Sequence, residues 1–97
     1  MRVISKKAIN QFIEEFPGSA EALLRWYIIT KETNWDNYEI LKKSFPATDA
    51  VGNALYVFNV GGNKFRIIAR INFRAGIVYV RFVGTHKQYD RVNLSVL

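Results

Sequence analysis

The strongest constraint on the fold is a two-residue alternation of side chains in the second half of the chain. Between Lys64 and Arg74, one face collects Phe65, Ile67, Ala69, Ile71 and Phe73, and the other collects Arg66, Ile68, Arg70, Asn72 and Arg74. Gly61-Gly62 before this run and Ala75-Gly76 after it are tight-turn signals. The pattern predicts three consecutive antiparallel strands, over residues 55–60, 64–74 and 77–83.

The first half of the chain follows a helical period instead. Apolar residues recur at helical spacing in two segments, 8–16 and 23–30, and Pro17-Gly18 separates them. Ser5 and Ser19 are the candidate N-caps of these segments. The short connection predicts an antiparallel helical hairpin, and we expect its aromatic side chains in the core.

A short third element and a loop should join the two halves. Asp36 and Glu39 have capping-box spacing, which predicts a short helix or turn that ends at Phe45-Pro46. Residues 47–53 read as a loop. Helices followed by a meander are typical of an α+β domain. We therefore expect one domain over residues 1–97, with the helical hairpin packed on a sheet of three to four antiparallel strands.

Composition narrows the chemistry that is available. The chain has no cysteine and a single histidine, so we expect neither disulfides nor a metal site. No cofactor fingerprint is present, and we expect no cofactor. No apolar run is long enough to span a bilayer. We expect a soluble, cytoplasmic protein that makes no use of a membrane.

Charge is strongly segregated along the chain. Residues 1–63 hold seven basic and seven acidic side chains, whereas residues 64–97 hold seven basic side chains and only Asp90. The whole net charge of +6 therefore belongs to the last third. Such a concentration favours a polyanionic partner, either nucleic acid or an acidic protein segment, over a merely solvated face. Arginine predominates in this region, which suits phosphate recognition.

The arginines of the second predicted strand form a candidate binding face. Arg66 and Arg70 are four residues apart and should share one face, with Lys64 before them and Arg74 after them. Arg81 of the next strand joins them if the register allows. Unpaired arginines repel each other unless an anion lies between them. An RNA phosphate or an acidic peptide would serve, and pairing with Glu14, Glu15 or Glu21 of the helices is the alternative.

The stretch GTHKQYD, residues 84–90, is the candidate catalytic segment, and we expect Gly84 to permit a bend before it. RNA cleavage without a metal needs a deprotonated 2′-hydroxyl, a stabilised phosphate and a protonated leaving oxygen. His86 can give or take a proton, Lys87 and Arg66 can stabilise the phosphate, and Tyr89 can stack on a base or assist proton transfer. A lone histidine after a strand is equally an ordinary polar residue, so these residues alone leave both readings open.

Residues 57–90 closely resemble the HigB-type toxins of bacterial toxin–antitoxin modules, which belong to the RelE-like superfamily. The resemblance rests on the Phe-Asn-Val-Gly-Gly-Asn hairpin, Lys-Phe-Arg, Arg-Ala-Gly-Ile-Val-Tyr and Gly-Thr-His-Lys-Gln-Tyr-Asp. It implies a small ribonuclease toxin that enters the ribosomal A site and cuts mRNA. It also implies a HigA-type antitoxin with a helix-turn-helix domain, through which alone the pair would contact operator DNA.

The resemblance also assigns roles to single residues. It implies that Arg66 contacts the scissile phosphate and that His86, Lys87 and Tyr89 complete the catalytic group. The other basic residues of this region would bind RNA or the ribosome, namely Lys64, Arg70, Arg74, Arg81 and Arg91. A non-catalytic basic module that binds RNA or an antitoxin is the alternative, as is a partner-binding remnant without activity.

Overall fold

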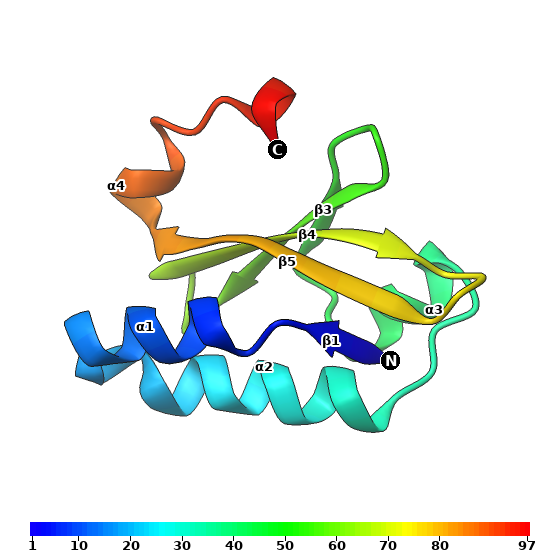
Figure 1. Cartoon of the computed structure of the whole chain (residues 1–97), viewed down its shortest axis with the longest axis horizontal. Coiled ribbons are helices and arrows are strands. Elements are labelled where there is room, and N and C mark those ends of the chain that lie inside the picture. Colours follow the sequence, from blue (N-terminus) through cyan, green and yellow to red (C-terminus); the bar gives the residue numbers. More distant parts are fainter.

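A five-stranded mixed sheet lies between a layer of helices and a C-terminal segment in the computed structural model, which describes all residues 1–97 (Figure 1). The strands are β1 (Arg2–Ile4), β2 (Thr48–Ala50), β3 (Leu55–Val60), β4 (Phe65–Asn72) and β5 (Ile77–Thr85), in the order β1-β5-β4-β3-β2. The helices are α1 (Lys7–Glu15), α2 (Ala20–Glu32), α3 (Tyr38–Ser44) and α4 (His86–Tyr89), with 3-10 turns η1 (Pro17–Ser19) and η2 (Leu94–Val96).

The predicted α+β class and the central meander are confirmed, but the strand count was too low. β3, β4 and β5 pair antiparallel as expected, with β2 antiparallel to β3. β1 pairs parallel to β5, with Val3 opposite Val78, so the sheet is mixed. β2 lies within the predicted loop 47–53. Both missed strands have three residues, too few to show a period of two, and β1 pairs with a segment more than seventy residues away.

The helix ends differ from the expected caps. α1 follows β1 directly and has no side-chain cap, so Ser5 plays no capping part. Ser19 stands at the predicted N-cap position of α2, but its hydroxyl donates to the Phe16 carbonyl at 2.6 Å and makes no capping bond to α2. Asn37, not Asp36, caps α3, because its side-chain oxygen accepts from the backbone N–H of Ile40 at 3.0 Å. None of the helices is both long enough and apolar enough to cross a membrane.

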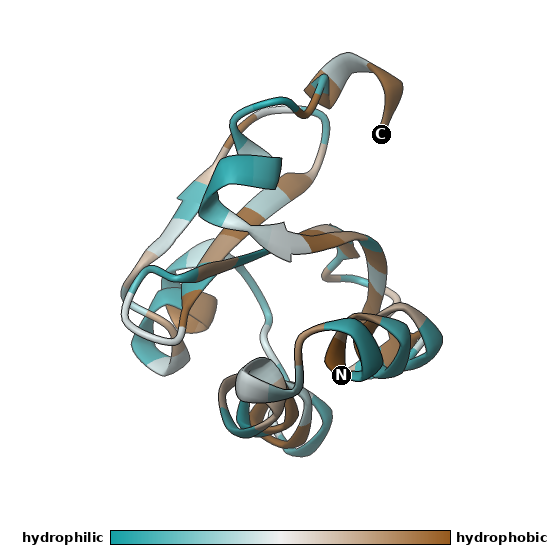
Figure 2. Ribbon diagram, turned by 90° about the vertical axis from the view of Figure 1, so that its left-hand side faces the viewer, coloured by the Kyte–Doolittle hydropathy of each residue, from teal (hydrophilic) through white to brown (hydrophobic).

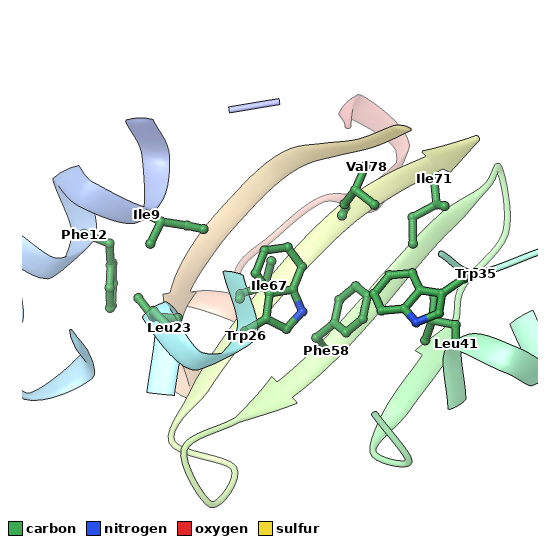
Figure 3. Packing of buried hydrophobic residues seen from close by; sticks show 11 residues of the cluster. Ile9, Phe12, Leu23, Trp26, Trp35, Leu41, Phe58, Ile67, Ile71 and Val78 are labelled. Atoms are coloured by element: carbon green, nitrogen blue, oxygen red, sulfur yellow. The ribbon is translucent and has the colours of Figure 1, made fainter. Parts of the chain in front are cut away.

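The main core lies between the helices and the sheet, and it contains the aromatic residues that the sequence assigned to it (Figure 3). The Phe58 ring of β3 lies 6.3 Å from the Trp35 ring in a stacked geometry and 5.2 Å from the Trp26 ring edge-on. All three side chains are buried, and Trp26 comes from α2. This aromatic group fixes α2 and the segment before α3 on the same face of β3.

The opposite face of the sheet, which we expect to be partly open and lined by arginines, is covered at its centre. Leu55, Val57 and Ile68 are buried there under the C-terminal segment. The side chains that pack against these three are Val51, Phe82, Tyr89, Val92, Leu94 and Leu97. Figure 2 shows the hydrophilic α4 and the C-terminal segment on the opposite side of the sheet from α1 and α2. The basic side chains therefore surround a second apolar cluster.

A β-bulge changes the register of β5 at Arg81. Ile68 pairs with Phe82 and Ala69 pairs with Val80, so Arg81 has no partner on β4. Arg81 borders a shallow hollow beside α1, near Glu15. Because of the bulge, apolar residues of β5 both before and after Arg81 lie on the face of the sheet that the helices cover. As a result, Arg81 does not extend the arginine row of β4.

Arg70 holds the C-terminal segment over the second apolar cluster. Its guanidinium donates Nη1–H to the Asn53 carbonyl and Nη2–H to the backbone oxygen of Leu97, the latter at 3.1 Å. These bonds tie the loop before β3 and the C-terminal segment to the middle of β4. Arg70 therefore has a structural role beside the RNA contact that the sequence predicts for it.

We predict that Arg70→Ala lowers the free energy of unfolding by about 1–3 kcal/mol, because two hydrogen bonds from a charged donor are lost. Urea denaturation measures the change, and limited proteolysis should cut the C-terminal segment faster. Arg74→Ala is the control, since Arg74 is exposed in the β4–β5 turn and should change stability by no more than about 0.5 kcal/mol. Equal effects of the two variants would contradict this role.

Candidate functional site

The start of β4, the end of β5 and α4 meet at one corner of the sheet (Figure 1), which we call the basic corner: Arg66, His86, Lys87 and Tyr89. Arg66 lies opposite Gly84 in the β4–β5 pairing. The backbone N–H of His86 donates to the Lys64 carbonyl at 3.1 Å, which extends this pairing to the first residue of α4. The structure thus brings the four predicted catalytic residues into one corner.

A capping box fixes α4 at the end of β5. Thr85 Oγ1 accepts from the Gln88 backbone N–H at 3.2 Å, and Gln88 Oε1 accepts from the Thr85 backbone N–H at 2.9 Å. The predicted bend at Gly84 is wrong, because β5 continues through Thr85 and the chain turns there into α4. The Thr-x-x-Gln spacing is visible in the sequence and would have identified this short helix.

Gly84 makes the close packing under α4 possible. The Phe82 ring occupies the space where a side chain at this position would begin, and a Cβ there would also lie 2.9 Å from Gln88 Oε1. Gly84 is itself buried. Any larger residue would therefore push Phe82 or the capping residue Gln88 away and move α4 relative to Arg66.

Arg66 presents a partly buried guanidinium that no carboxylate neutralises. Its Nη1–H donates to the Asn63 carbonyl at 2.8 Å and to the Phe65 carbonyl at 3.3 Å, and its Cζ lies 5.8 Å from the centre of the Tyr89 ring. These contacts hold the guanidinium in place and leave Nε and Nη2 free to donate. The alternative pairing with helix carboxylates is absent, since the only ion pair in the structure joins His86 and Asp90.

His86 has a carboxylate neighbour that the sequence analysis did not single out. Its Nδ1 lies 3.4 Å from Asp90 Oδ2, and more than half of each side chain is exposed (58% and 61%). A carboxylate beside Nδ1 favours the tautomer with the proton on that nitrogen, which leaves Nε2 as the free acceptor. The signal for this pair was the four-residue spacing, which brings two side chains together once α4 is recognised as a helix.

The remaining basic residues are spread more widely than the sequence suggested. Arg70 lies four residues along β4, about 13 Å from Arg66. Arg74 lies in the turn at the far end of β4, and Arg81 lies at the bulge beside α1. Lys64 and Arg91 flank the basic corner in the chain, the first in the β3–β4 hairpin and the second just after α4. RNA contact by these five residues stays a prediction.

Comparison with known proteins identifies the family. The family described as the RelE-like toxic component HigB of a toxin–antitoxin system matches residues 19–92. The chain belongs to the HigB toxin family. The matched range includes all four residues of the basic corner. The HigB toxins are one half of a toxin–antitoxin pair, so membership implies an antitoxin as partner.

Relatives of this HigB family member carry a name that states an activity. The chain is 35% identical over 94 residues to "mRNA interferase HigB" of Escherichia coli O6:H1 (strain CFT073), covering 95% of this chain and 91% of that protein. It is also 35% identical over 92 residues to "mRNA interferase toxin HigB" of Escherichia coli K12, covering 93% and 88%. The same identity and coverage hold for "mRNA interferase HigB" of Shigella flexneri.

We predict that Gly84→Ala lowers the free energy of unfolding by about 1–3 kcal/mol, because the added methyl group overlaps the Phe82 ring. Thermal or urea denaturation measures the effect. Gly18→Ala is the matched control, since nothing lies within 4 Å of a Cβ built there. A stable Gly84→Ala protein with unchanged contacts around α4 in its nuclear magnetic resonance spectrum would contradict this packing.

Proposed function

We propose that this HigB family member is an endoribonuclease that inhibits translation by cleaving mRNA in the ribosomal A site, without a metal ion. The observation that carries the proposal is the Arg66 guanidinium, which is held by backbone carbonyls beside His86 and Lys87 and lacks an anionic partner. The names of the relatives support mRNA as the substrate. The protein would act in the cytoplasm, where its substrate is translated.

The proposed reaction is an internal transfer of the phosphate. The ribose 2′-oxygen attacks the adjacent phosphorus, a new P–O2′ bond forms and the P–O5′ bond breaks. The 2′-hydroxyl gives up its proton to a base, and the leaving 5′-oxygen receives one from an acid. The products are a 2′,3′-cyclic phosphate and a 5′-hydroxyl. No oxidant or cofactor enters this balance.

Each residue of the basic corner has a proposed role in this reaction. The free Nε–H and Nη2–H groups of Arg66 would donate to the phosphate oxygens as negative charge develops on them, with Lys87 as a second cation. Nε2 of His86 would exchange the proton. The Tyr89 ring supports the Arg66 guanidinium at 5.8 Å, and it would thereby keep the phosphate-binding group in position.

The distribution of charge supports the proposal that the protein acts while bound to a large polyanion. The net charge is +6, and exposed cations lie outside the basic corner at Arg74, Arg81 and Arg91. We propose that these side chains, with Lys64 and the outer part of Arg70, contact RNA of the ribosome and the message. Such contacts release counterions, so ribosome binding should weaken steeply as salt rises. A HigA-type antitoxin with a helix-turn-helix domain would restrain the toxin and connect it to operator DNA.

We predict that Arg66→Ala and His86→Ala each reduce mRNA cleavage by about 10²-fold or more, because each removes a group that acts in the transition state. Primer extension on a message in a translating extract measures cleavage. Lys31→Ala is the control, because Lys31 is exposed on α2 within the neutral half of the chain. Thermal melting should show that the corner variants remain folded, and cleavage at the wild-type rate by both would refute these roles.

We further predict that the downstream fragments carry a 5′-hydroxyl, which polynucleotide kinase labels without prior phosphatase treatment. A 5′-phosphate would instead indicate attack by water with the 3′-oxygen as leaving group. The same message added without ribosomes should stay intact. Salt-sensitive RNA binding with no cleavage in either assay would favour the non-catalytic module.

A further inference from the structure

An open hollow of about 510 Å³ lies between α2 and the β3–β4 hairpin, on the helical side of the sheet. Its lining includes the aromatic residues Trp26, Phe45 and Phe65 and the charged residues Glu21, Arg25 and Lys64. Phe65 packs toward the helices against Phe12, whereas its neighbour Arg66 lies on the other face of β4. The hollow and the basic corner are therefore on opposite sides of the same hairpin.

The floor of the hollow is apolar and closely packed. Six of its lining residues are hydrophobic, among them Trp26, Phe45 and Phe65. Gly61 lets the hairpin approach α2, since a Cβ there would lie 3.3 Å from the Ala22 side chain and 2.9 Å from the Phe65 ring. The Trp26 indole N–H is buried and has no hydrogen-bond partner. The floor thus offers apolar contact to a bound segment.

The rim carries charge that nothing in the chain neutralises. Arg25 and Lys64 line the hollow with one carboxylate, Glu21, and none of the three forms an ion pair. Ile28 follows Arg25 by three residues on α2 and is 53% exposed, one of only three large hydrophobic side chains that are exposed. Positions three apart are neighbours on a helix surface, so Ile28 extends the apolar surface beside Arg25. The result is a hollow with apolar residues at its floor and a net positive rim.

We propose that this hollow is a docking site for the antitoxin, and that it receives an extended segment with an apolar side chain on the floor and a carboxylate at Arg25. Charge complementarity favours this occupant, because a second copy of the chain would bring another net +6 against a positive rim. RNA would leave the apolar floor and Ile28 unused and would place phosphate next to Glu21. The inference depends on the toxin–antitoxin pairing of the family and is independent of the catalytic roles proposed above.

The test uses full-length protein with the antitoxin encoded in the same operon as the probe. Arg25→Glu replaces an exposed side chain at the rim, and Ile28→Glu replaces the exposed apolar side chain next to Arg25 on α2. Lys31→Glu is the matched control on the same helix, outside the hollow. Each variant is expressed alone to score growth arrest and then together with the antitoxin to score neutralisation. Affinity is measured by calorimetry with both purified partners, after thermal melting has shown that each variant is folded.

We expect Arg25→Glu and Ile28→Glu to remain toxic, to lose neutralisation and to bind the antitoxin at least tenfold more weakly, with Lys31→Glu unchanged. Wild-type affinity for both Arg25→Glu and Ile28→Glu would overturn the proposal. Loss of RNA cleavage with neutralisation intact would assign the hollow to RNA, and a change in sedimentation without antitoxin would assign it to self-association. If the wild-type chain were not toxic, the proposed catalysis would fail, while the calorimetric comparison would still decide the docking site.

Discussion

The pairing of β4 with β5 is the constraint on which the other parts of the structure depend. β4 is the central strand, and it is buried on both faces, with Ile67 facing the helices and Ile68 facing the C-terminal segment. The two apolar clusters are thus joined through a single strand. The same pairing sets Arg66 opposite Gly84 and continues into the bond between His86 and the Lys64 carbonyl. The position of the basic corner follows from the register of this one strand pair.

Backbone oxygens, not side-chain carboxylates, hold the two half-buried arginines of β4. Arg70 donates to the Asn53 carbonyl and to the backbone oxygen of Leu97, which holds the C-terminal segment over the sheet. Arg66 uses only Nη1 on the Asn63 and Phe65 carbonyls and keeps the rest of its guanidinium free. The Asn63 and Phe65 carbonyl oxygens orient the Arg66 guanidinium without cancelling its charge, because a carbonyl oxygen carries only a partial negative charge. Two arginines on one strand face therefore differ: Arg70 supports structure, and Arg66 keeps donors free for the anion binding that we propose.

The two sides of the sheet separate the two kinds of partner that we propose for this toxin. On the side of Arg66 and α4, the cations surround an apolar cluster that the chain itself covers, so only charge is left to contact RNA. On the side of α2, the hollow leaves apolar surface uncovered next to unpaired charge, which suits a protein segment. Catalysis at Arg66 and restraint at Arg25 and Ile28 would then depend on different residues, although Lys64 borders both sites.

The sequence by itself determined the α+β class, the two helices, the meander and the excess of positive charge, because each depends on local spacing or composition. The Thr85–Gln88 capping box at the start of α4 is equally local, and its spacing is present in the sequence, where we expect a bend at Gly84 instead. Only the tertiary structure decided the edge strands β1 and β2, the bulge at Arg81 and the position of the C-terminal segment that Arg70 holds over the sheet. These features depend on contacts between segments far apart in the chain. A three-residue strand or a single bulged residue is too short to produce a recognisable two-residue alternation in the local sequence.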